Sequence, residues 1–303
     1  MSLTLIVISF VFSLTHLSSI NQITKATLLS LYQLIPNLLP LMLLFLLANS
    51  LGLFYPVGYF LQPIFRNIFH IDCISSTLFL SSFFSGFPTN IKIIKNSYRD
   101  GSISLQQLNH LLKIASCPSF SFIVVVIGKN VFNSLQAGYF LYFIQVLSNL
   151  LLAFLIRPKE KPEKITLINI KEKMRKLKSQ QKIIALLSSS FLSCFQVFVI
   201  MYGFMLVFNI QIYILSSIIS NQFLLAFLHA SLEFTQGIPK LSIFSYPVAF
   251  GLTSFFLSFT SLSIIFQSTA LLEDIDYTIQ DFFLYRVKSG ILSIIIHIFF
   301  FCI

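Results

Sequence analysis

Long apolar runs without charged residues dominate the chain. They cover residues 1–24, 27–65, 73–91, 130–156, 183–232 and 241–272. A helix needs about 20 apolar residues to cross the hydrocarbon core of a bilayer, so these runs hold several crossings. The runs are continuously apolar instead of alternating every second residue, which favours helices over membrane strands. The pattern predicts an all-α polytopic membrane protein with about seven to nine membrane segments, some of them broken or re-entrant.

The composition agrees with this fold class. The 303 residues are 56% apolar and 10% charged, with a mean hydropathy of +0.87, whereas soluble domains carry about 25% charged residues. No Lys or Arg precedes Lys25, and no small-residue cleavage site follows a short apolar core. We therefore expect the first run to remain as a membrane helix and not to act as a cleaved signal peptide.

Positive charge is concentrated in one segment, residues 157–182. This segment holds ten of the 20 Lys and Arg residues, against three acids. Loops rich in Lys and Arg stay cytosolic, so the segment predicts a basic cytosolic connector between an N-terminal membrane half (1–156) and a C-terminal membrane half (183–303). The same side chains attract anionic lipid headgroups. Topology explains the net charge of +10, so we expect no nucleic-acid partner.

Two polar breaks interrupt the first half. Ser85, Gly86 and Pro88 lie inside an apolar run, and Pro is tolerated at the first position of a helix but not in its interior. We predict that the chain unwinds at residues 85–87 and restarts as a helix at Pro88. Unwound backbone at membrane depth must lie against protein or a water-filled cavity.

The second break follows a short amphipathic helix. Ser104 and Gln107 form a capping-box pattern for a helix over residues 105–115. Ser116 and Pro118 then predict a new helix through Ile127, with Ser116 as its cap. Helix N-termini carry a partial positive charge and free N–H groups. Two such ends would suit an anionic group in the middle of the membrane.

The second half contains a similar polar cluster. Ser258, Thr260 and Ser261 interrupt an apolar run, and a charged turn ends at Asp276, which predicts a capped helix continuing to Gly290. The distance from break to capped helix is similar in the two halves, so we predict an internal repeat that pairs the Gly86 break with the Ser261 break. Broken helices at corresponding places in two halves are typical of secondary transporters.

Three further polar residues have two interpretations each. Glu233 lies deep in an apolar run, where an acid is a functional candidate for binding a coupling ion, a proton or sodium; alternatively, Gly237 marks a surface loop that leaves Glu233 at the membrane edge. Lys92 either pairs with a substrate carboxylate or, with Lys95 and Arg99, marks an exposed helix end. Asn37 either offers an amide to a ligand or satisfies a backbone kinked by prolines.

These breaks and polar residues make up the candidate substrate site. The residues are Asn37, Ser85, Gly86, Pro88, Thr89, Asn90, Lys92, Ser116, Pro118, Ser119, Glu233, Thr260, Ser261, Ser263 and Gln267. The histidines and the four cysteines show no metal-ligand spacing, and no nucleophile elbow, phosphate loop or HExxH pattern is present. We therefore expect no enzyme activity, metal or cofactor, and the sequence leaves the oligomeric state open.

Seven motifs in order resemble one family, the sporulation integral membrane proteins of the YlbJ type. The motifs are PNLLP (36–40), QPIFRN (62–67), SGFPTNIK (85–92), PSFSFIVVVIG (118–128), LEFTQG (232–237), SFTSLSIIFQ (258–267) and RVKSG (286–290). The family shares the nucleoside-recognition or gate type of membrane domain. The resemblance implies transport of dipicolinate, a small dicarboxylate, from the mother cell toward the forespore across the outer forespore membrane.

Three functions remain in competition: a transporter of a small organic anion by alternating access, a nucleoside-type transporter on the same scaffold, and a non-transporting membrane assembly factor. A transporter requires the polar breaks to line a cavity near the middle of the bilayer. An assembly factor would pack them against other helices with no accessible volume. A nucleoside site would need paired amide and carboxylate groups, which this chain supplies sparsely.

Overall fold

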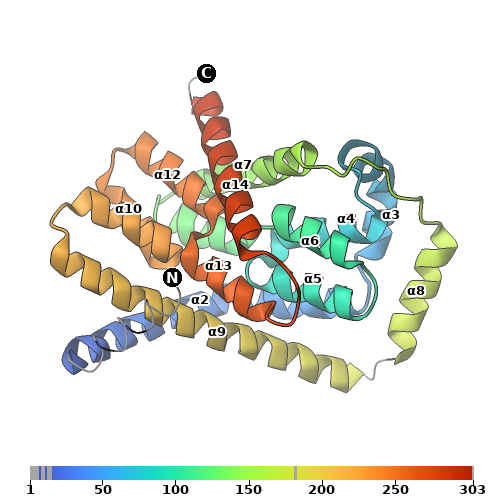
Figure 1. The fold of residues 1–303 in the computed structure, drawn as a ribbon, viewed down its shortest axis with the longest axis horizontal. Coiled ribbons are helices and arrows are strands. Elements are labelled where there is room, and N and C mark those ends of the chain that lie inside the picture. Colours follow the sequence, from blue (N-terminus) through green and yellow to red (C-terminus); the bar gives the residue numbers. More distant parts are fainter. Residues whose placement is uncertain (1–6, 8–10, 12–15, 181–182, 302–303) are drawn as a thin grey trace.

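The computed structural model describes residues 7, 11, 16–180 and 183–301, and this part of the chain is helical with no strand. Figure 1 shows the helices gathered into one bundle, with α9 along its length and α8 at one side. Their bounds are α2 (Leu17–Ser50), α3 (Tyr55–Ile64), η1 (Phe65–Phe69), α4 (Cys73–Ser85), α5 (Thr89–Arg99), α6 (Leu105–Ile114), η2 (Phe122–Lys129), α7 (Leu135–Leu155), α8 (Leu167–Gln180), α9 (Ile183–Ile218), α10 (Gln222–Leu232), α11 (Phe234–Lys240), η3 (Leu241–Ile243), α12 (Tyr246–Phe259), α13 (Ser261–Leu271) and α14 (Ile279–Phe301).

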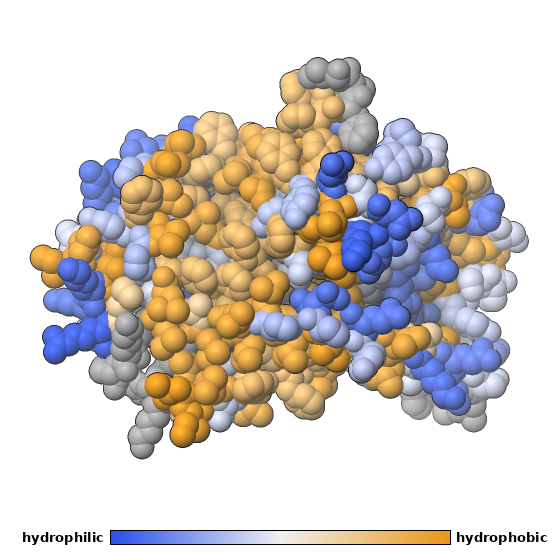
Figure 2. Space-filling model, turned by 180° about the vertical axis from the view of Figure 1, so that it is seen from behind, coloured by the Kyte–Doolittle hydropathy of each residue, from blue (hydrophilic) through white to orange (hydrophobic). Residues whose placement is uncertain are grey.

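Five stretches are long and apolar enough to cross a membrane, judged by length and composition. They are Ser18–Ser50, Leu135–Leu155, Ile183–Ile218, Tyr246–Leu271 and Ile279–Phe300. Large apolar side chains such as Phe60, Phe195 and Phe299 lie exposed on these and neighbouring helices. Figure 2 shows a broad apolar surface between hydrophilic residues that gather at both sides, one of them the side where α8 lies. Such a surface is stable against lipid but not against water. The chain is therefore an all-α, multi-pass membrane protein, as predicted.

The basic connector marks one end of the bundle, which we call the connector end. The Nδ1 atom of His70 lies 2.7 Å from the carbonyl oxygen of Pro158, and the Nε atom of Arg66 donates to that of Pro162 at 2.7 Å. Arg157, just after α7, donates to the carbonyl oxygen of Ile68 at 3.1 Å. The η1 turn, the start of α4 and the end of α7 therefore share this end.

Helices α4 and α5 form a re-entrant hairpin, hairpin 1, that enters from the connector end. Asp72 caps α4 by accepting from the N–H groups of Ile74 and Ser75, at 2.8 and 3.1 Å. The other carboxylate oxygen of Asp72 accepts from the amide of Gln107, in the first turn of α6, at 2.8 Å. Because α5 leads into α6, both arms of the hairpin begin and end at the same end of the bundle, and the tip lies at Gly86–Pro88.

Helices α6 and η2 follow hairpin 1 and lead away from the connector end. Neither is long enough alone to cross a membrane, and the irregular residues 115–119, the first break, separate them. The α6 start carries the predicted capping box, since the Ser104 and Gln107 side chains each bond to the other's backbone N–H. Helix α7 then returns to the connector end.

The second half begins with α9, which runs antiparallel to α2. Asn209, toward the end of α9, donates to Thr27, near the start of α2, at 2.9 Å. Helices α10 and α11 then form hairpin 2, in which Gly237 lies directly against the backbone of Ala230. This hairpin enters from the end opposite the connector, and Glu233 is its tip.

Helices α12 and α13 form a broken crossing. Its interruption, the second break, lies at Thr260 and Ser261, which have φ angles of +70° and +61°. The end of α13 reaches the connector end, where the Leu271 carbonyl oxygen accepts from Lys95 of α5 at 2.6 Å. Helix α14 returns antiparallel to α12, with the Ser293 hydroxyl donating to the Ser254 carbonyl oxygen at 3.0 Å.

The order of elements indicates a repeat, but not the predicted one. Among the described residues, five stretches qualify as crossings by length and composition, or six if the bent pair Tyr55–Phe69 and Cys73–Ser85 forms one span, against seven to nine predicted segments. Hairpin 1 corresponds to hairpin 2, and the first break corresponds to the second. The prediction that paired the Gly86 break with the Ser261 break is therefore wrong. The two hairpins enter from opposite ends, which is the pattern of inverted repeats in transporters.

Candidate functional site

The tip of hairpin 1 packs directly onto the first break. Gly86 has a φ of +66°, and its Cα lies so close to Ser119 that the structure leaves no room for a Cβ atom. The side-chain amide of Asn90 donates to the carbonyl oxygen of Ala115. Two of the predicted interruptions thus meet inside the bundle, and Pro88 immediately precedes the first residue of α5, as the sequence predicted within one position.

The capping at the first break differs from the prediction. The Ser116 hydroxyl donates backward to the Leu112 carbonyl oxygen at 3.2 Å, so it does not cap the next helix. The Ser119 hydroxyl instead accepts from the N–H of Phe122 at 3.3 Å. Pro118 forces extended backbone on the residue before it, which moves the helix start beyond the proline and makes Ser119 the cap.

The second break is also buried. Thr260, Ser261, Ser263 and Gln267 are all 0% exposed, and the Gln267 amide donates to the Ser263 hydroxyl at 2.9 Å. The prediction for the following helix was wrong at both ends, because α14 begins at Ile279 and continues to Phe301 without a cap from Asp276.

Several polar atoms at the tip of hairpin 1 and at the second break have no hydrogen-bond partner among the described residues. They are Ser85 Oγ, Thr89 Oγ1, Ser261 Oγ and Gln267 Oε1, and each residue is at most 2% exposed. Leaving a buried polar group unpaired costs about 1–3 kcal/mol, and native proteins contain few such groups. These polar atoms therefore do not stabilise the fold by hydrogen bonds within the described part of the chain.

Glu233 forms the tip of hairpin 2, which packs against η2. It is 0% exposed, and its carboxylate accepts from the N–H groups of Thr235 and Gln236 at 3.2 and 2.9 Å and from the Thr235 hydroxyl at 2.6 Å. The ring of Phe234 lies 5.2 Å from that of Phe122 in η2. The surface-loop interpretation is wrong, since Glu233 is the buried N-cap of α11.

This capping role predicts the effect of two substitutions. Glu233→Ala removes all three acceptor contacts, and we expect it to lower the free energy of unfolding by about 1–2 kcal/mol. Glu233→Gln keeps a side-chain oxygen for the cap and should unfold within a few degrees of the wild type. If Glu233 also binds a coupling ion, Glu233→Gln should abolish ion-driven transport in liposomes. Full transport by this variant would leave Glu233 with the capping role alone.

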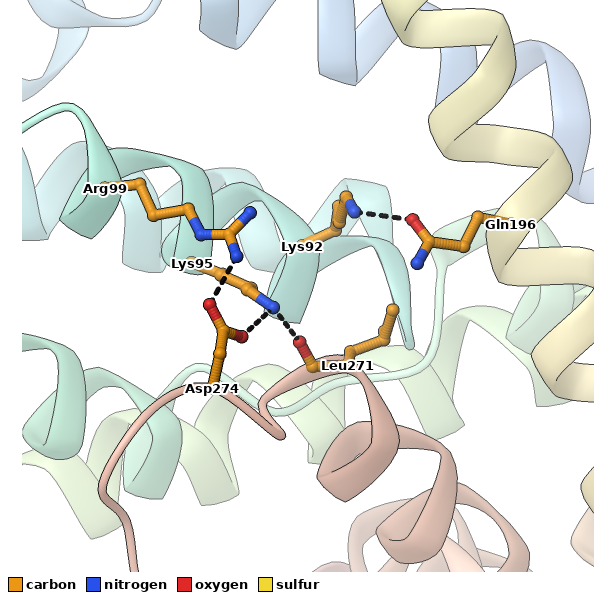
Figure 3. A network of polar contacts seen from close by, with 6 residues as sticks. All are labelled: Lys92, Lys95, Arg99, Gln196, Leu271 and Asp274. Atoms are coloured by element: carbon orange, nitrogen blue, oxygen red, sulfur yellow. Dashed lines mark hydrogen bonds and ion pairs between the residues drawn. The ribbon is translucent and has the colours of Figure 1, made fainter.

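Lys92 and Asn37 both bond to protein groups. The ammonium of Lys92 donates to the Gln196 side-chain oxygen on α9 at 2.7 Å (Figure 3). The Asn37 amide donates to the Gln33 carbonyl oxygen at 3.2 Å, within the same helix. The carbonyl groups that Pro36 and Pro40 leave without a backbone donor are those of Tyr32 and Pro36, so this bond does not decide between the two interpretations of Asn37.

The connector end of hairpin 1 is held by an ion cluster, which we call the Asp274 cluster. Asp274, in the turn between α13 and α14, pairs with both Lys95 and Arg99 of α5 (Figure 3). Hydrogen bonds from Lys95 and then Arg99 lower the pKa of Asp274 from its ordinary value of 3.8 to about 2. Lys95 is buried, so the interpretation of this helix as an exposed end is wrong at that residue.

Arg286 of α14 is a residue that the site prediction missed. It is 0% exposed, its Nη1 donates to the carbonyl oxygen of Ser116 at 3.0 Å, and its Nη2 donates to that of Lys113. The only sequence signal was its place in the RVKSG motif, because the first half of α14 also contains the charged residues Asp281 and Lys288.

The polar breaks are closed in this structure. Cavities of about 430 Å³ between α2, α9 and α10, and of about 870 Å³ at the connector end, are lined by other residues. The residues of the two breaks and of the hairpin 1 tip are buried, and none of them lines these two cavities.

Comparison with known proteins agrees with the sequence motifs. The chain is 22% identical to the sporulation integral membrane protein YlbJ of Bacillus subtilis (strain 168), over 84% of this chain and 71% of that relative. The resemblance to the YlbJ type is confirmed. No protein-family model matches the chain, and no solved structure matches it. The relative's name supports an integral membrane protein and gives no substrate.

Proposed function

We propose that this chain is a sporulation membrane transporter that moves a small organic anion, with dipicolinate as the first candidate, by alternating access. In a spore-forming cell it would lie in the outer forespore membrane with residues 157–182 in the cytosol. A proton or sodium ion would drive the transport. The resemblance to the YlbJ type implies the substrate and the membrane.

The single observation that carries the proposal is the group of unpartnered polar atoms at the tip of hairpin 1 and at the second break. Ser85, Thr89, Ser261 and Gln267 bring polar atoms inside the bundle that no described residue satisfies. A ligand with carboxylate and ring-nitrogen groups would supply the missing partners. Helix α5 begins at Thr89 and helix α13 begins at Ser261. The N-terminal end of a helix favours negative charge.

Two hairpins that enter from opposite ends also support transport. Each tip lies in the interior, and movement of one hairpin at a time would open the same site to one side of the membrane and then to the other. The closed packing of the breaks is what an assembly factor would show, so this alternative remains. The unpartnered polar atoms favour the transporter, because an assembly factor gains nothing from them.

Uptake of labelled dipicolinate by purified protein in liposomes tests the proposal. We expect saturable uptake by the wild type, and a loss of at least about tenfold in Thr89→Val, which removes an unpartnered hydroxyl without changing the shape of the side chain. Because that hydroxyl has no partner, its removal should not lower the unfolding temperature. Ser82→Ala is the matched control, since the Ser82 hydroxyl bonds only within its own helix.

Other outcomes favour the alternatives. Uptake of uridine but not of dipicolinate would favour the nucleoside-type transporter. Uptake of neither, with protein that unfolds cooperatively, would favour the assembly factor.

A further inference from the structure

Arg286 is a buried cation without a carboxylate partner. It lies in the first third of α14, inside a crossing of the membrane, and is 0% exposed. The ion pairs in the described part of the chain involve Asp274 and Asp281, and neither pairs with Arg286. A charged residue at the centre of a bilayer costs about 2.5–3.5 kcal/mol on insertion scales. The burial of such a residue indicates a compensating interaction or a functional role.

The contacts of Arg286 satisfy the guanidinium only in part. Its two terminal nitrogens donate to backbone carbonyl oxygens of Lys113 and Ser116, at the C-terminal end of α6, where the helix dipole is negative. Its Nε atom has no partner among the described residues. The Ser289 hydroxyl, about one turn further along the same face of α14, is also buried and unpartnered.

The position of Arg286 connects it to the candidate site. Ser116 belongs to the first break, and this break is the surface on which the tip of hairpin 1 packs through Gly86 and Asn90. A movement of hairpin 1 away from the first break would therefore uncover backbone that Arg286 already touches. The guanidinium group binds a carboxylate with two parallel N–H donors. Two backbone carbonyl oxygens from different residues do not need this parallel pair of donors.

We propose that Arg286 binds a carboxylate of the transported anion. In the closed state the carbonyl oxygens at the end of α6 hold the guanidinium, and in the loaded state the guanidinium donates to the substrate carboxylate, with Ser289 as a further donor. This inference rests on the proposed function and narrows its substrate class to carboxylates. In this proposal α14 supplies the cationic side chain of the substrate site, whereas the hairpin tips and broken helices supply hydroxyl and amide groups.

The competing role is structural, because an arginine at a helix C-terminus also stabilises that helix. Loss of the side chain lowers the unfolding temperature under either role. The two roles differ in affinity: a structural cap changes stability without changing how tightly a folded protein binds a carboxylate.

The experiment compares Arg286→Gln and Arg286→Lys with the wild type, using equilibrium binding of labelled dipicolinate to purified protein. We expect the dissociation constant to rise about 100-fold in Arg286→Gln and about tenfold in Arg286→Lys, which keeps the charge but loses the planar pair of donors. Lys288→Gln is the matched control, since Lys288 lies on the exposed side of the same helix over the ring of Tyr285. It should bind as the wild type does.

The dimethyl ester of dipicolinate distinguishes the loss of carboxylate recognition from a general distortion of the binding site. As a competitor it lacks both carboxylates, so its weak competition should be the same in the wild type and in Arg286→Lys. An unchanged dissociation constant for dipicolinate in folded Arg286→Lys would overturn this inference while leaving transport intact, and this variant decides alone if Arg286→Gln does not fold. A wild type that neither binds nor transports dipicolinate overturns the proposed function and this inference together.

Discussion

Replacing Gly86 with alanine is expected to lower the free energy of unfolding by about 3 kcal/mol and to abolish transport. Gly86 has a φ of +66° and a ψ of 174°, a region that is essentially restricted to glycine, so an alanine there costs about 1–3 kcal/mol from its own backbone conformation. The added Cβ would also collide with the backbone of Ser119, and such overpacking costs about 1–3 kcal/mol. Since backbone atoms cannot rotate away, the tip of hairpin 1 must move off the first break.

The control for this substitution is Gly101→Ala. Gly101 has a φ of +72°, close to that of Gly86, but a Cβ there would meet nothing within 4 Å. We expect this variant to lose about 1 kcal/mol and to keep transport. Unfolding temperature in detergent and dipicolinate uptake in liposomes provide the two measurements. Equal destabilisation by both substitutions would mean that the hairpin tip does not depend on the contact with Ser119.

The local features of the fold were predictable from the sequence because they depend on neighbouring residues. Long apolar runs specify helices in lipid, where the backbone must satisfy itself. The pair Ser104 and Gln107 specifies a capping box within one turn, and the structure confirms it. Gly86 and Pro88 end one helix and start another, as expected for residues that permit a positive φ and restrict the helix interior.

Features that depend on contacts between distant segments were not predictable in the same way. The sequence shows that the chain breaks at Gly86 and again at Thr260, but not that one break turns the chain back and the other lets it continue. That difference depends on Gln107 meeting Asp72 and on Lys95 meeting Leu271. The wrong pairing of the repeat follows from this, since break spacing alone does not distinguish a hairpin from a crossing.

Two charged residues show the same limit from opposite directions. Glu233 attracted attention as a lone acid, and the structure shows that its carboxylate is occupied by N–H groups two and three residues away. Arg286 attracted none, since a basic residue that has Asp281 and Lys288 nearby in the sequence is ordinary at the end of a membrane helix. Only the structure shows that Arg286 is buried, because the residues at the end of α6 that cover it are distant in the sequence.

The Asp274 cluster has a role that follows from the position of hairpin 1. Hairpin 1 is anchored at its tip by the first break and at its connector end by Asp274, which joins α5 to the turn after α13 (Figure 3). If hairpin 1 opens toward the connector end, the ion pairs with Lys95 and Arg99 must separate. They therefore hold the closed state that the structure shows.

Asp274→Ala is expected to open hairpin 1. Lys95 would remain as a buried ammonium bonded only to the Leu271 carbonyl oxygen, and an unpaired buried charge is strongly unfavourable. In a background in which the other three cysteines are alanine, the rate at which a maleimide labels Cys117, a fully buried thiol in the first break, should rise at least about tenfold. Glu273→Ala removes the same charge from an exposed neighbour that makes no ion pair among the described residues, and it should leave the rate unchanged.

The pH dependence of stability tests the same ion pairs without a labelling reagent. The pKa of Asp274 is lowered to about 2 in the folded protein, from an ordinary value of 3.8, so its contribution is present above about pH 4 and is lost as the pH falls toward 2. The unfolding temperature of the wild type should therefore fall more steeply between pH 4 and pH 2 than that of Asp274→Ala. Parallel curves, together with an unchanged labelling rate, would show that the cluster is a surface contact and that hairpin 1 is held closed by its other contacts, such as those of Gly86 and Asn90 with the first break.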